Sequence, residues 1–251
     1  MPFEDHPLLT TPPDDTVLWR YLSLTRFMNL LEHKTLWFSR MDKFDDPLEG
    51  TFTDVELDQM ASLPVSSALP ILGFSRPAGT VKDATQSFLR IIEIIRMSHF
   101  VSCWREGPHE SMAMWDIYGK GDGKIAIKSD AGRLRDALLT YEGSIYVGRV
   151  EYVPWDTATW PRNALLHCFR KDRSYEHEAE VRAVISGFRN HKVPRGDALR
   201  IEVAVDPPSL ITQVVVGPRE QDGTVRLLEA ILERYGLTIR VTASDRLKRR
   251  S

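Results

Sequence analysis

Two kinds of hydrophobic pattern alternate along this chain, and together they predict its secondary structure. Short apolar runs, such as residues 17–21 and 36–38, are typical of β-strands. Between these two runs, apolar residues fall three or four positions apart, which is the spacing of one helix face, at Leu24, Phe27, Met28, Leu30 and Leu31. Ser23 or Thr25 is a suitable N-cap. The first forty residues therefore predict a strand, a helix and a second strand.

The same patterns predict the remaining elements. Helices are expected at residues 54–61, 82–97, 110–118, 131–139, 160–170 and 223–235. Strands are expected at residues 99–104, 125–127, 144–153, 181–186, 199–205, 212–216 and 237–241. Because the helices and strands are interspersed without a uniform β-α-β order, we expect an α+β fold. It would be a single domain in which helices surround a mixed or antiparallel sheet.

Composition sets apart only the two ends of the chain and one internal segment. Residues 1–15 are polar and rich in proline, which predicts a loose N-terminal arm. Residues 62–80 carry several Pro, Ser and Gly residues, as a loop or insertion does, and residues 244–251 form a short basic tail. No internal repeat or linker divides the rest, so residues 16–243 are expected to form one domain.

The charge balance restricts the classes of function. The 251 residues include 33 Lys and Arg against 35 Asp and Glu. This excludes a protein held on nucleic acid by a general basic surface, although a local basic groove stays open. No apolar run reaches the roughly 20 residues that cross a bilayer, and the first residues do not resemble a secretory signal. We therefore expect a cytoplasmic protein without a membrane partner.

Most standard catalytic signatures are absent. The sequence contains no glycine-rich nucleotide loop, no H-E-x-x-H zinc motif and no G-x-S-x-G elbow. Its two cysteines, Cys103 and Cys168, show no metal-ligand or disulfide spacing. Cys103 lies near His99 and His109, as a nucleophile would, but an isolated cysteine in an apolar segment is more typical of core packing.

Four segments carry residues whose chemistry is unusual for their setting. In residues 18–21, Arg20 lies among bulky apolar side chains and needs an acceptor, either a carboxylate in a salt bridge or an anion such as phosphate. In residues 44–50, Asp45, Asp46 and Glu49 fall in a proline turn. They either shape the bend or hold a metal ion or substrate hydroxyls.

The third segment, residues 102–118, combines hydroxyl, acidic and aromatic side chains. It contains Ser102, Trp104, Glu110, Trp115 and Tyr118. Trp115 and Tyr118 are three residues apart in the predicted helix and so would share a face. The rings belong either to the core or to a platform that stacks on a flat ligand.

The fourth segment, residues 175–182, is rich in glutamate. If it is extended, Glu176, Glu178, Glu180 and Arg182 point to one face. Three neighbouring carboxylates repel one another unless a cation or hydroxyl groups face them. The segment is therefore either a solvated strand edge or a Glu-x-Glu pair aimed at a sugar.

Taken together, these segments resemble a large, mostly bacterial family known only as a domain of unknown function. The shared motifs fall, in order, at residues 18–21, 44–49, 102–104, 114–118, 123–127 and 178–182, and the match spans roughly residues 17–242. The first and last motifs contain Tyr21 and Arg182, which are further candidate substrate-binding residues. The family name itself implies no activity.

The order of motifs also resembles that of ADP-ribosyltransferases. That fold opens with a strand bearing Arg or His, then a helix and a second strand, and it carries a catalytic glutamate, often as Glu-x-Glu, on a late strand. Arg20, Ser102 and the pair Glu178 and Glu180 occupy matching positions, although no Ser-Thr-Ser triplet follows Ser102. The resemblance implies an ADP-ribosyltransferase-like fold with NAD as substrate and no metal.

The resemblance also implies a role for each candidate residue. Loss of nicotinamide from NAD leaves an oxocarbenium-like ribose, which a carboxylate stabilises. Glu180 would bind a ribose hydroxyl, Glu178 would orient or deprotonate the acceptor, and Arg20 would hold the pyrophosphate. The rings that would stack on nicotinamide are those of Trp104, Trp115 or Tyr118. The acceptor is a protein, a nucleic acid or water, and the biological role would be that of a toxin or a phage-defence effector.

Two other functions stay open from the sequence. A metal-dependent nuclease or hydrolase would bind Mg²⁺ through Asp45, Asp46, Glu49, Glu178 and Glu180. Against it, Arg182 stands where such enzymes place a lysine after the paired acids. A non-enzymatic module would instead bind a nucleotide or peptide at the tryptophan-rich segment.

Overall fold

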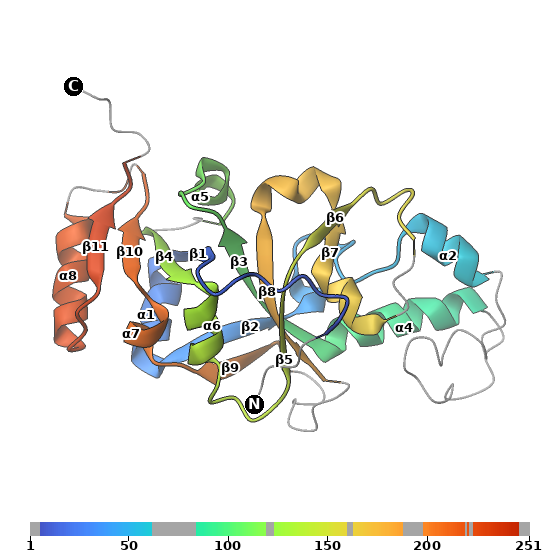
Figure 1. Cartoon of the computed structure of the whole chain (residues 1–251), viewed down its shortest axis with the longest axis horizontal. Helices are drawn as coiled ribbons and strands as arrows, with labels where there is room; N and C mark the ends of the chain where they lie inside the picture. The colour runs from blue at the N-terminus through green and yellow to red at the C-terminus, as the bar shows by residue number, and fades with distance from the viewer. Residues whose placement is uncertain are drawn as a thin grey trace.

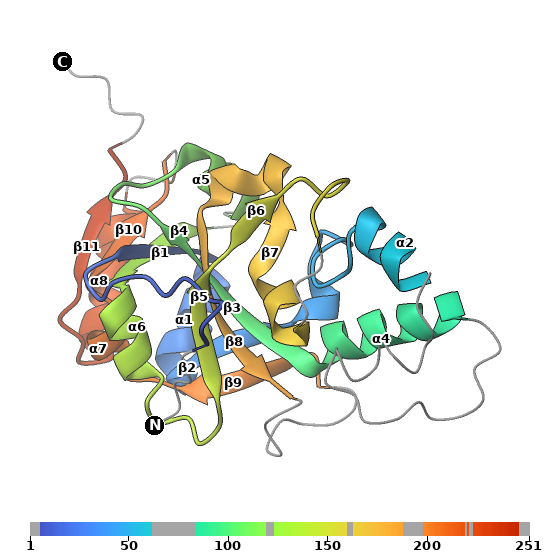
Figure 2. The same ribbon diagram turned by 45° about the vertical axis from the view of Figure 1, so that its right-hand side comes forward.

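A mixed β-sheet forms the centre of the molecule, and helices pack on both of its faces (Figures 1 and 2). The computed structural model describes residues 6–61, 84–118, 123–159, 163–187, 198–218, 220 and 223–245. The loop expected at residues 62–80 and all but the first two residues of the basic tail lie outside these ranges.

Nine strands of the described residues make up the main sheet. They are β1 (Val17–Ser23), β2 (Thr35–Arg40), β3 (His99–Glu106), β4 (Lys124–Asp130), β5 (Ile145–Arg149), β8 (Glu180–Ser186), β9 (Arg200–Ala204), β10 (Gln213–Val216) and β11 (Arg240–Ala243). The order is β11-β10-β4-β1-β3-β2-β9, with β8 beside β3 and β5 beside β8. Pairing is antiparallel except between β10 and β11. The expected single α+β domain with a mixed sheet is confirmed.

The remaining elements surround this sheet. The helices of the described residues are α1 (Leu24–His33), α2 (Asp54–Ala61), α4 (Ala84–Ser98), α5 (Met112–Tyr118), α6 (Ala131–Ala137), α7 (Pro207–Leu210) and α8 (Thr224–Arg234). They also include the short 3₁₀ helices η1 (Met41–Lys43), η2 (Ala164–Phe169) and η3 (Arg173–Glu178), and β6 (Glu151–Val153) pairs with β7 (Arg170–Asp172) in a small second sheet. In both views α8 lies at one end of the molecule and α2 and α4 lie at the other.

Strand β3 is the hub of the sheet because it has three partners. Strand β8 pairs along β3 from His99 to Arg105. On the opposite edge, β2 pairs only at Val101 and Phe100, and β1 pairs only at Glu106 and Arg105. The central part of this edge of β3 therefore pairs with neither β1 nor β2. We call the space between β1 and β2 at this point the strand gap.

The two faces of the sheet pack against different partners. On the main-core face, Leu18 and Trp104 pack with residues of α1, α6 and α8. On the opposite face, Tyr21 packs with Trp115 of α5, and Val184 packs with residues of η2. Because alternate residues of a strand point to opposite faces, one strand supplies both cores.

Most elements expected from hydrophobic spacing are present, and two differ from the expectation. Ser23 caps α1 as expected, since its hydroxyl accepts a hydrogen bond from Arg26 N–H. The strand expected at residues 144–153 is two strands, β5 and β6, that belong to different sheets. The helix expected at residues 160–170 is the shorter 3₁₀ helix η2.

The N-terminal segment, which we expected to form a loose arm, contacts the domain from residue 6 onward. Thr10 accepts a hydrogen bond from the N–H of Arg149 in β5 at 2.9 Å, and the Thr11 hydroxyl donates to the Val147 carbonyl at 3.4 Å. Asp14 accepts one from Gly132 N–H. These bonds fix residues 10–14 along β5 and the start of α6.

Candidate functional site

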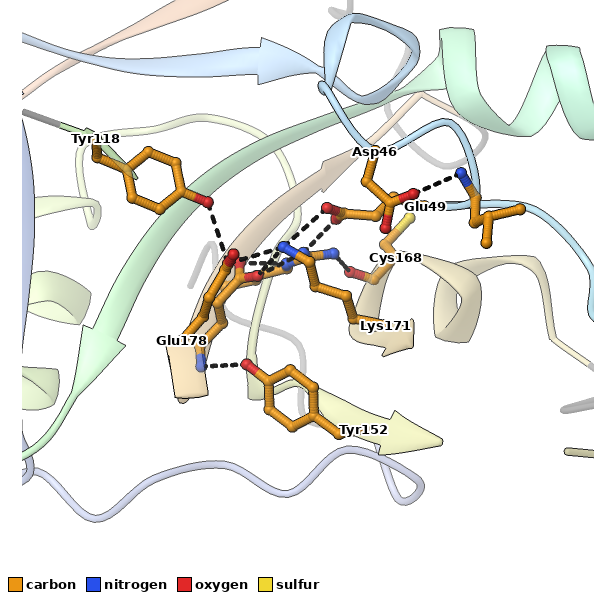
Figure 3. Close-up of polar contacts among 10 residues, drawn as sticks. Asp46, Glu49, Tyr118, Tyr152, Cys168, Lys171 and Glu178 are labelled. Carbon is orange, nitrogen blue, oxygen red and sulfur yellow. Dashed lines mark hydrogen bonds and ion pairs between the residues drawn. The ribbon is translucent and has the colours of Figure 1, made fainter. Parts of the chain in front are cut away.

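Five charged side chains meet on the sheet face opposite the main core, and Figure 3 shows Glu49, Lys171 and Glu178 among them. This charge cluster consists of Glu49, Lys171, Glu178, Glu180 and Arg182. Each side chain is at most 4% exposed. Charges are buried in this way only where each one is paired and hydrogen-bonded, because desolvation is otherwise too costly. The pairing of the cluster therefore decides what it can do.

A tight turn after η1 positions Glu49. Asp46 Oδ1 accepts a hydrogen bond from Leu48 N–H at 2.9 Å, so Asp46 shapes the bend, which was one of the two interpretations of this segment. Gly50 ends the turn with a φ of +74°, and a Cβ there would lie 2.7 Å from Met41 Sδ. Both facts require glycine at this position. The turn directs Glu49 inward, while Asp45 is exposed.

The junction of η3 and β8 positions the two glutamates. Glu178 is the last residue of η3, Ala179 has a left-handed φ of 43°, and Glu180 begins β8. The condition that residues 175–182 are extended is therefore met only from Glu180 onward, in β8. Glu176 lies in η3 and is exposed, so it does not share a face with Glu180.

Lys171 and Arg182 link the three carboxylates. Lys171 Nζ lies 2.8 Å from Glu178 Oε2, 3.0 Å from Glu180 Oε1 and 3.0 Å from Glu49 Oε1. Arg182 donates from Nε and Nη2 to both oxygens of Glu180, at 2.9 Å each, and its Nη2 also contacts Glu49. Such a bidentate arginine pair fixes both the position and the charge of a carboxylate.

Neighbouring charges shift the pKa values of the two glutamates in opposite directions. Burial, together with the charge of Glu180, raises the pKa of Glu178 to about 7. Burial alone would also raise the pKa of Glu180, but the charge and hydrogen bonds of Arg182 outweigh it and lower the pKa. Hydrogen bonding between the two carboxyls adds to both shifts, raising the pKa of Glu178 and lowering that of Glu180. The pair thus holds one ionised carboxylate beside one that exchanges a proton near neutral pH.

Two tyrosines contact this pair. The Tyr118 hydroxyl donates to Glu178 Oε2 at 3.1 Å, and the Tyr152 hydroxyl accepts from Glu180 N–H at 2.7 Å (Figure 3). Tyr118 is 44% exposed, so it connects buried Glu178 with solvent. Burial and the charge of Glu178 raise the pKa of Tyr118, which keeps its hydroxyl protonated and a donor.

The structure separates Arg20, Ser102 and Trp104 from the glutamates. In the β3–β8 pairing, Arg105 lies opposite Glu180, whereas Ser102 lies opposite Ala183. Directly opposite residues share a face, so Ser102 and Trp104 face the main core. Arg20 donates to Ser102 Oγ at 2.7 Å and is likewise on that side. The expected joint site of these three residues with Glu178 and Glu180 is not formed.

The expected aromatic platform is not formed either. Trp104 is 1% exposed within the main core, and Trp115 is fully buried against Tyr21, with ring centroids 4.8 Å apart. The Tyr21 hydroxyl accepts a hydrogen bond from Ser111 N–H at 2.8 Å. Both indoles therefore pack as core residues, and Tyr118 is the member of the trio whose ring reaches solvent.

The local environment also bears on two alternatives that the sequence left open, a Cys103 nucleophile and a Mg²⁺ site. Burial and the charge of Glu180 raise the pKa of the Cys103 thiol well above its usual value, which opposes a nucleophilic role.

The Mg²⁺ alternative meets a steric and electrostatic obstacle, because Lys171 Nζ occupies the point between the three carboxylates that a cation would take. Within the described ranges, no group of three His, Cys, Asp or Glu residues is arranged to hold a metal ion.

Sequence reasoning missed Lys171 and Tyr152. The repulsion among neighbouring glutamates did indicate that a cation or hydroxyl groups must face them, but nothing in the sequence indicated which residues supply them. Lys171 lies in a three-residue strand with no hydrophobic alternation. Tyr152 lies in β6, which pairs with that strand, so both residues depend on a small sheet that the sequence pattern does not reveal.

Comparison with known proteins adds no identification. No protein-family model matches the chain, and no curated protein matches it. Among the described helices, none is long and apolar enough to cross a membrane. The functional argument therefore rests on the geometry of the charge cluster.

Proposed function

We propose that the chain is an enzyme that cleaves the N-glycosidic bond of NAD, either transferring ADP-ribose to an acceptor or releasing it to water. The observation that carries the proposal is the Glu178–Glu180 pair, in which one carboxyl exchanges a proton near pH 7 and its neighbour stays ionised. Pairs of carboxyls with separated pKa values are typical of glycosidic chemistry.

The two glutamates take different parts in this reaction. Glu180, held ionised by Arg182 and Lys171, stabilises the positive charge that develops on the ribose. Glu178 accepts the proton of the attacking hydroxyl or water, which suits a pKa of about 7. Nicotinamide leaves as a neutral molecule, so the reaction needs this base but no separate acid.

Substrate would reach the pair from the side of Tyr118. Its ring is 44% exposed and its hydroxyl contacts Glu178, so a ribose hydroxyl that replaced this contact would lie beside both carboxyls. The ring then offers a stacking surface for nicotinamide. Arg20, Ser102, Trp104 and Trp115 have no part in this version of the site.

The order of elements also supports an ADP-ribosyltransferase-like fold. The domain opens with a strand bearing Arg20, then α1 and β2, and a late strand, β8, begins at Glu180. The position of Arg20 on the face opposite Glu180 is a departure from the expected site. The proposal therefore depends on the glutamate pair and not on Arg20.

The test is nicotinamide release from labelled NAD, with purified protein alone and with host lysate added as a source of acceptor. Glu178→Gln should lower the rate about 100-fold or more, which is the usual contribution of a general base. Glu176→Gln is the matched control, because this glutamate lies in the same 3₁₀ helix but is exposed, and its rate should equal that of the wild type. Chelation should leave the rate unchanged.

A non-enzymatic module is the second candidate, and one observation favours it. Every charge of the cluster already has an opposite charge within hydrogen-bonding distance, as in a purely structural network. If folded wild-type protein releases no nicotinamide with or without lysate, this candidate replaces the enzyme. Equal rates for wild type and Glu178→Gln would remove Glu178 from the mechanism.

A further inference from the structure

The charge cluster also restricts which acceptor can take the ADP-ribose, an inference that rests on the proposed function. Its three carboxylates have six oxygens, and five of these contact Lys171 or Arg182. The five are Glu178 Oε2, both oxygens of Glu180 and both oxygens of Glu49. Most positions at which a positively charged acceptor would pair are therefore already filled by cations of this chain.

Lys171 is held firmly between these oxygens. An ammonium group has three N–H donors, and Lys171 Nζ has a different carboxylate for each of them, at 2.8 to 3.0 Å. The ring of Tyr175 lies 4.6 Å from the same nitrogen, measured to its centroid, which adds a cation–π contact. An incoming cation does not displace Lys171, because its departure would break several buried ion pairs at once.

A cationic acceptor would also meet the charge of Lys171 directly. An acceptor that gives its proton to Glu178 must come within hydrogen-bonding distance of that carboxyl, and Lys171 Nζ lies only 2.8 Å from Glu178 Oε2. A guanidinium or ammonium group at Glu178 would therefore stand a few ångströms from a like charge in a buried site, where the repulsion is strong. A neutral nucleophile meets no such repulsion.

The burial of Glu178 limits the size of the acceptor as well. Its side chain is 3% exposed, and the partly exposed Tyr118 donates to it from the side of the solvent (Figure 3). With the ribose of NAD beside Tyr118, the substrate covers this approach, and the acceptor must fit into the buried part of the site. Water is the neutral nucleophile that meets both conditions.

We propose that the acceptor is water and that Lys171 excludes positively charged acceptors, so that the products are nicotinamide and free ADP-ribose. The oxygen of water forms a bond to the anomeric carbon of the ribose, while the bond from that carbon to the pyridinium nitrogen breaks. The electron pair of the broken bond leaves with nicotinamide, which becomes neutral, and one proton of the water passes to Glu178. Lys171 is thus a specificity-determining residue of the proposed reaction.

The test analyses the products that the purified full chain forms from NAD labelled in its adenosine part, with and without agmatine as a small guanidinium acceptor. Wild type should release nicotinamide and free ADP-ribose in equal amounts, and agmatine should not change this ratio. With host lysate added, macromolecules should take up no more label than in lysate alone. ADP-ribosyl-agmatine or extra label on macromolecules would overturn the proposal while NAD cleavage stands. No release of nicotinamide would contradict the proposed function itself, and this proposal with it.

Lys171→Gln tests the reason for the exclusion. It should raise the share of ADP-ribosyl-agmatine among the products about tenfold or more above wild type, because the like charge that opposes a guanidinium is gone. Lys43→Gln is the matched control, since Lys43 is an exposed lysine of η1, and its products should be those of wild type. The readout is a ratio of products, so a slower variant still answers the question.

Two further measurements keep the role of Lys171 testable. Lys171→Met, which keeps the length of the side chain, replaces Lys171→Gln if that variant does not fold. If the folded variant is inactive, calorimetric titration with agmatine should show binding about tenfold tighter than to wild type. A folded variant that neither modifies agmatine nor binds it more tightly than wild type would overturn the role of Lys171.

Discussion

At the scale of single residues, the proton on Glu178 links the charge cluster to folding. With Glu178 protonated, Glu49 and Glu180 balance Lys171 and Arg182, whereas ionised Glu178 leaves one uncompensated negative charge. The pKa of Glu178 is about 7, against 4.5 for an unperturbed glutamate. Between these values the folded protein keeps a proton that the unfolded chain has lost, so this residue makes the free energy of unfolding fall as pH rises.

Glu178→Gln should remove this effect. From pH 5 to pH 8, the variant should gain about 3 kcal/mol of stability relative to wild type, since one pKa unit corresponds to about 1.4 kcal/mol. Urea unfolding at several pH values measures this difference. Glu176→Gln should track the wild type throughout. A constant difference between Glu178→Gln and wild type would show that Glu178 does not hold its proton near neutral pH.

At the scale of elements, two chain reversals place ordinary residues in the left-handed region. Lys34, which ends α1, has a φ of 50°, and Ala179, which ends η3, has a φ of 43°. A side chain at such a position costs roughly 1 kcal/mol that glycine avoids, although glycine also has more freedom in the unfolded chain. Ala179 lies between the two glutamates, so its strain is part of the geometry of the site.

Lys34→Gly and Ala179→Gly should each raise the free energy of unfolding by about 0.5 kcal/mol, the part of the strain relief that the unfolded chain does not offset. The measurement is the midpoint of urea unfolding. Lys34→Ala controls for loss of the lysine side chain, and it should bring no gain because its Cβ keeps the steric conflict. A loss of stability in both glycine variants would show that the left-handed conformations are not strained.

The elements also show how far sequence reasoning reaches. Hydrophobic spacing and the Ser23 cap predicted β1, α1 and β2 correctly, because these signals are local. The pattern of residues 175–182 is equally consistent with a strand. Residues 173–178 are not a strand, because Asp172 caps a 3₁₀ helix by accepting a hydrogen bond from Ser174 N–H, and Ala179 then reverses the chain.

The candidate site was predicted only in part, because the alignment of neighbouring strands decides which residues share a sheet face. Glu178, Glu180 and Arg182 were identified as residues that need partners. Whether Arg20 and Glu180 share a face depends on how β1, β3 and β8 are aligned, and a shift of one residue would exchange the faces. No local pattern encodes that alignment.

At the scale of the whole molecule, two buried histidines join separate parts of the fold. His99 Nδ1 lies 2.6 Å from the Ile95 carbonyl of α4, and its Nε2 lies 3.1 Å from Ser186 Oγ of β8. His167 of η2 lies 3.0 Å from the Thr51 carbonyl, through its Nδ1. These contacts connect α4, β8, η2 and the loop before α2, so protonation of either ring would disturb packing between elements.

This arrangement predicts how the fold responds to acid. Burial lowers the pKa of His99 to about 4 and that of His167 to about 3, from 6.5. Below pH 6.5 the unfolded chain therefore binds protons that the folded protein does not, and each histidine removes about 1.4 kcal/mol of stability per pH unit. Acidification from pH 7 to pH 5 also lets Glu178 raise the free energy of unfolding, so the effect of each histidine is measured as the difference between a variant and wild type.

In urea unfolding at pH 7 and pH 5, His99→Gln and His167→Gln should each lose less stability on acidification than wild type, by about 2 kcal/mol. His177→Gln changes an exposed ring and should lose as much as wild type, and an equal loss in all four proteins would show that the buried rings do take up protons.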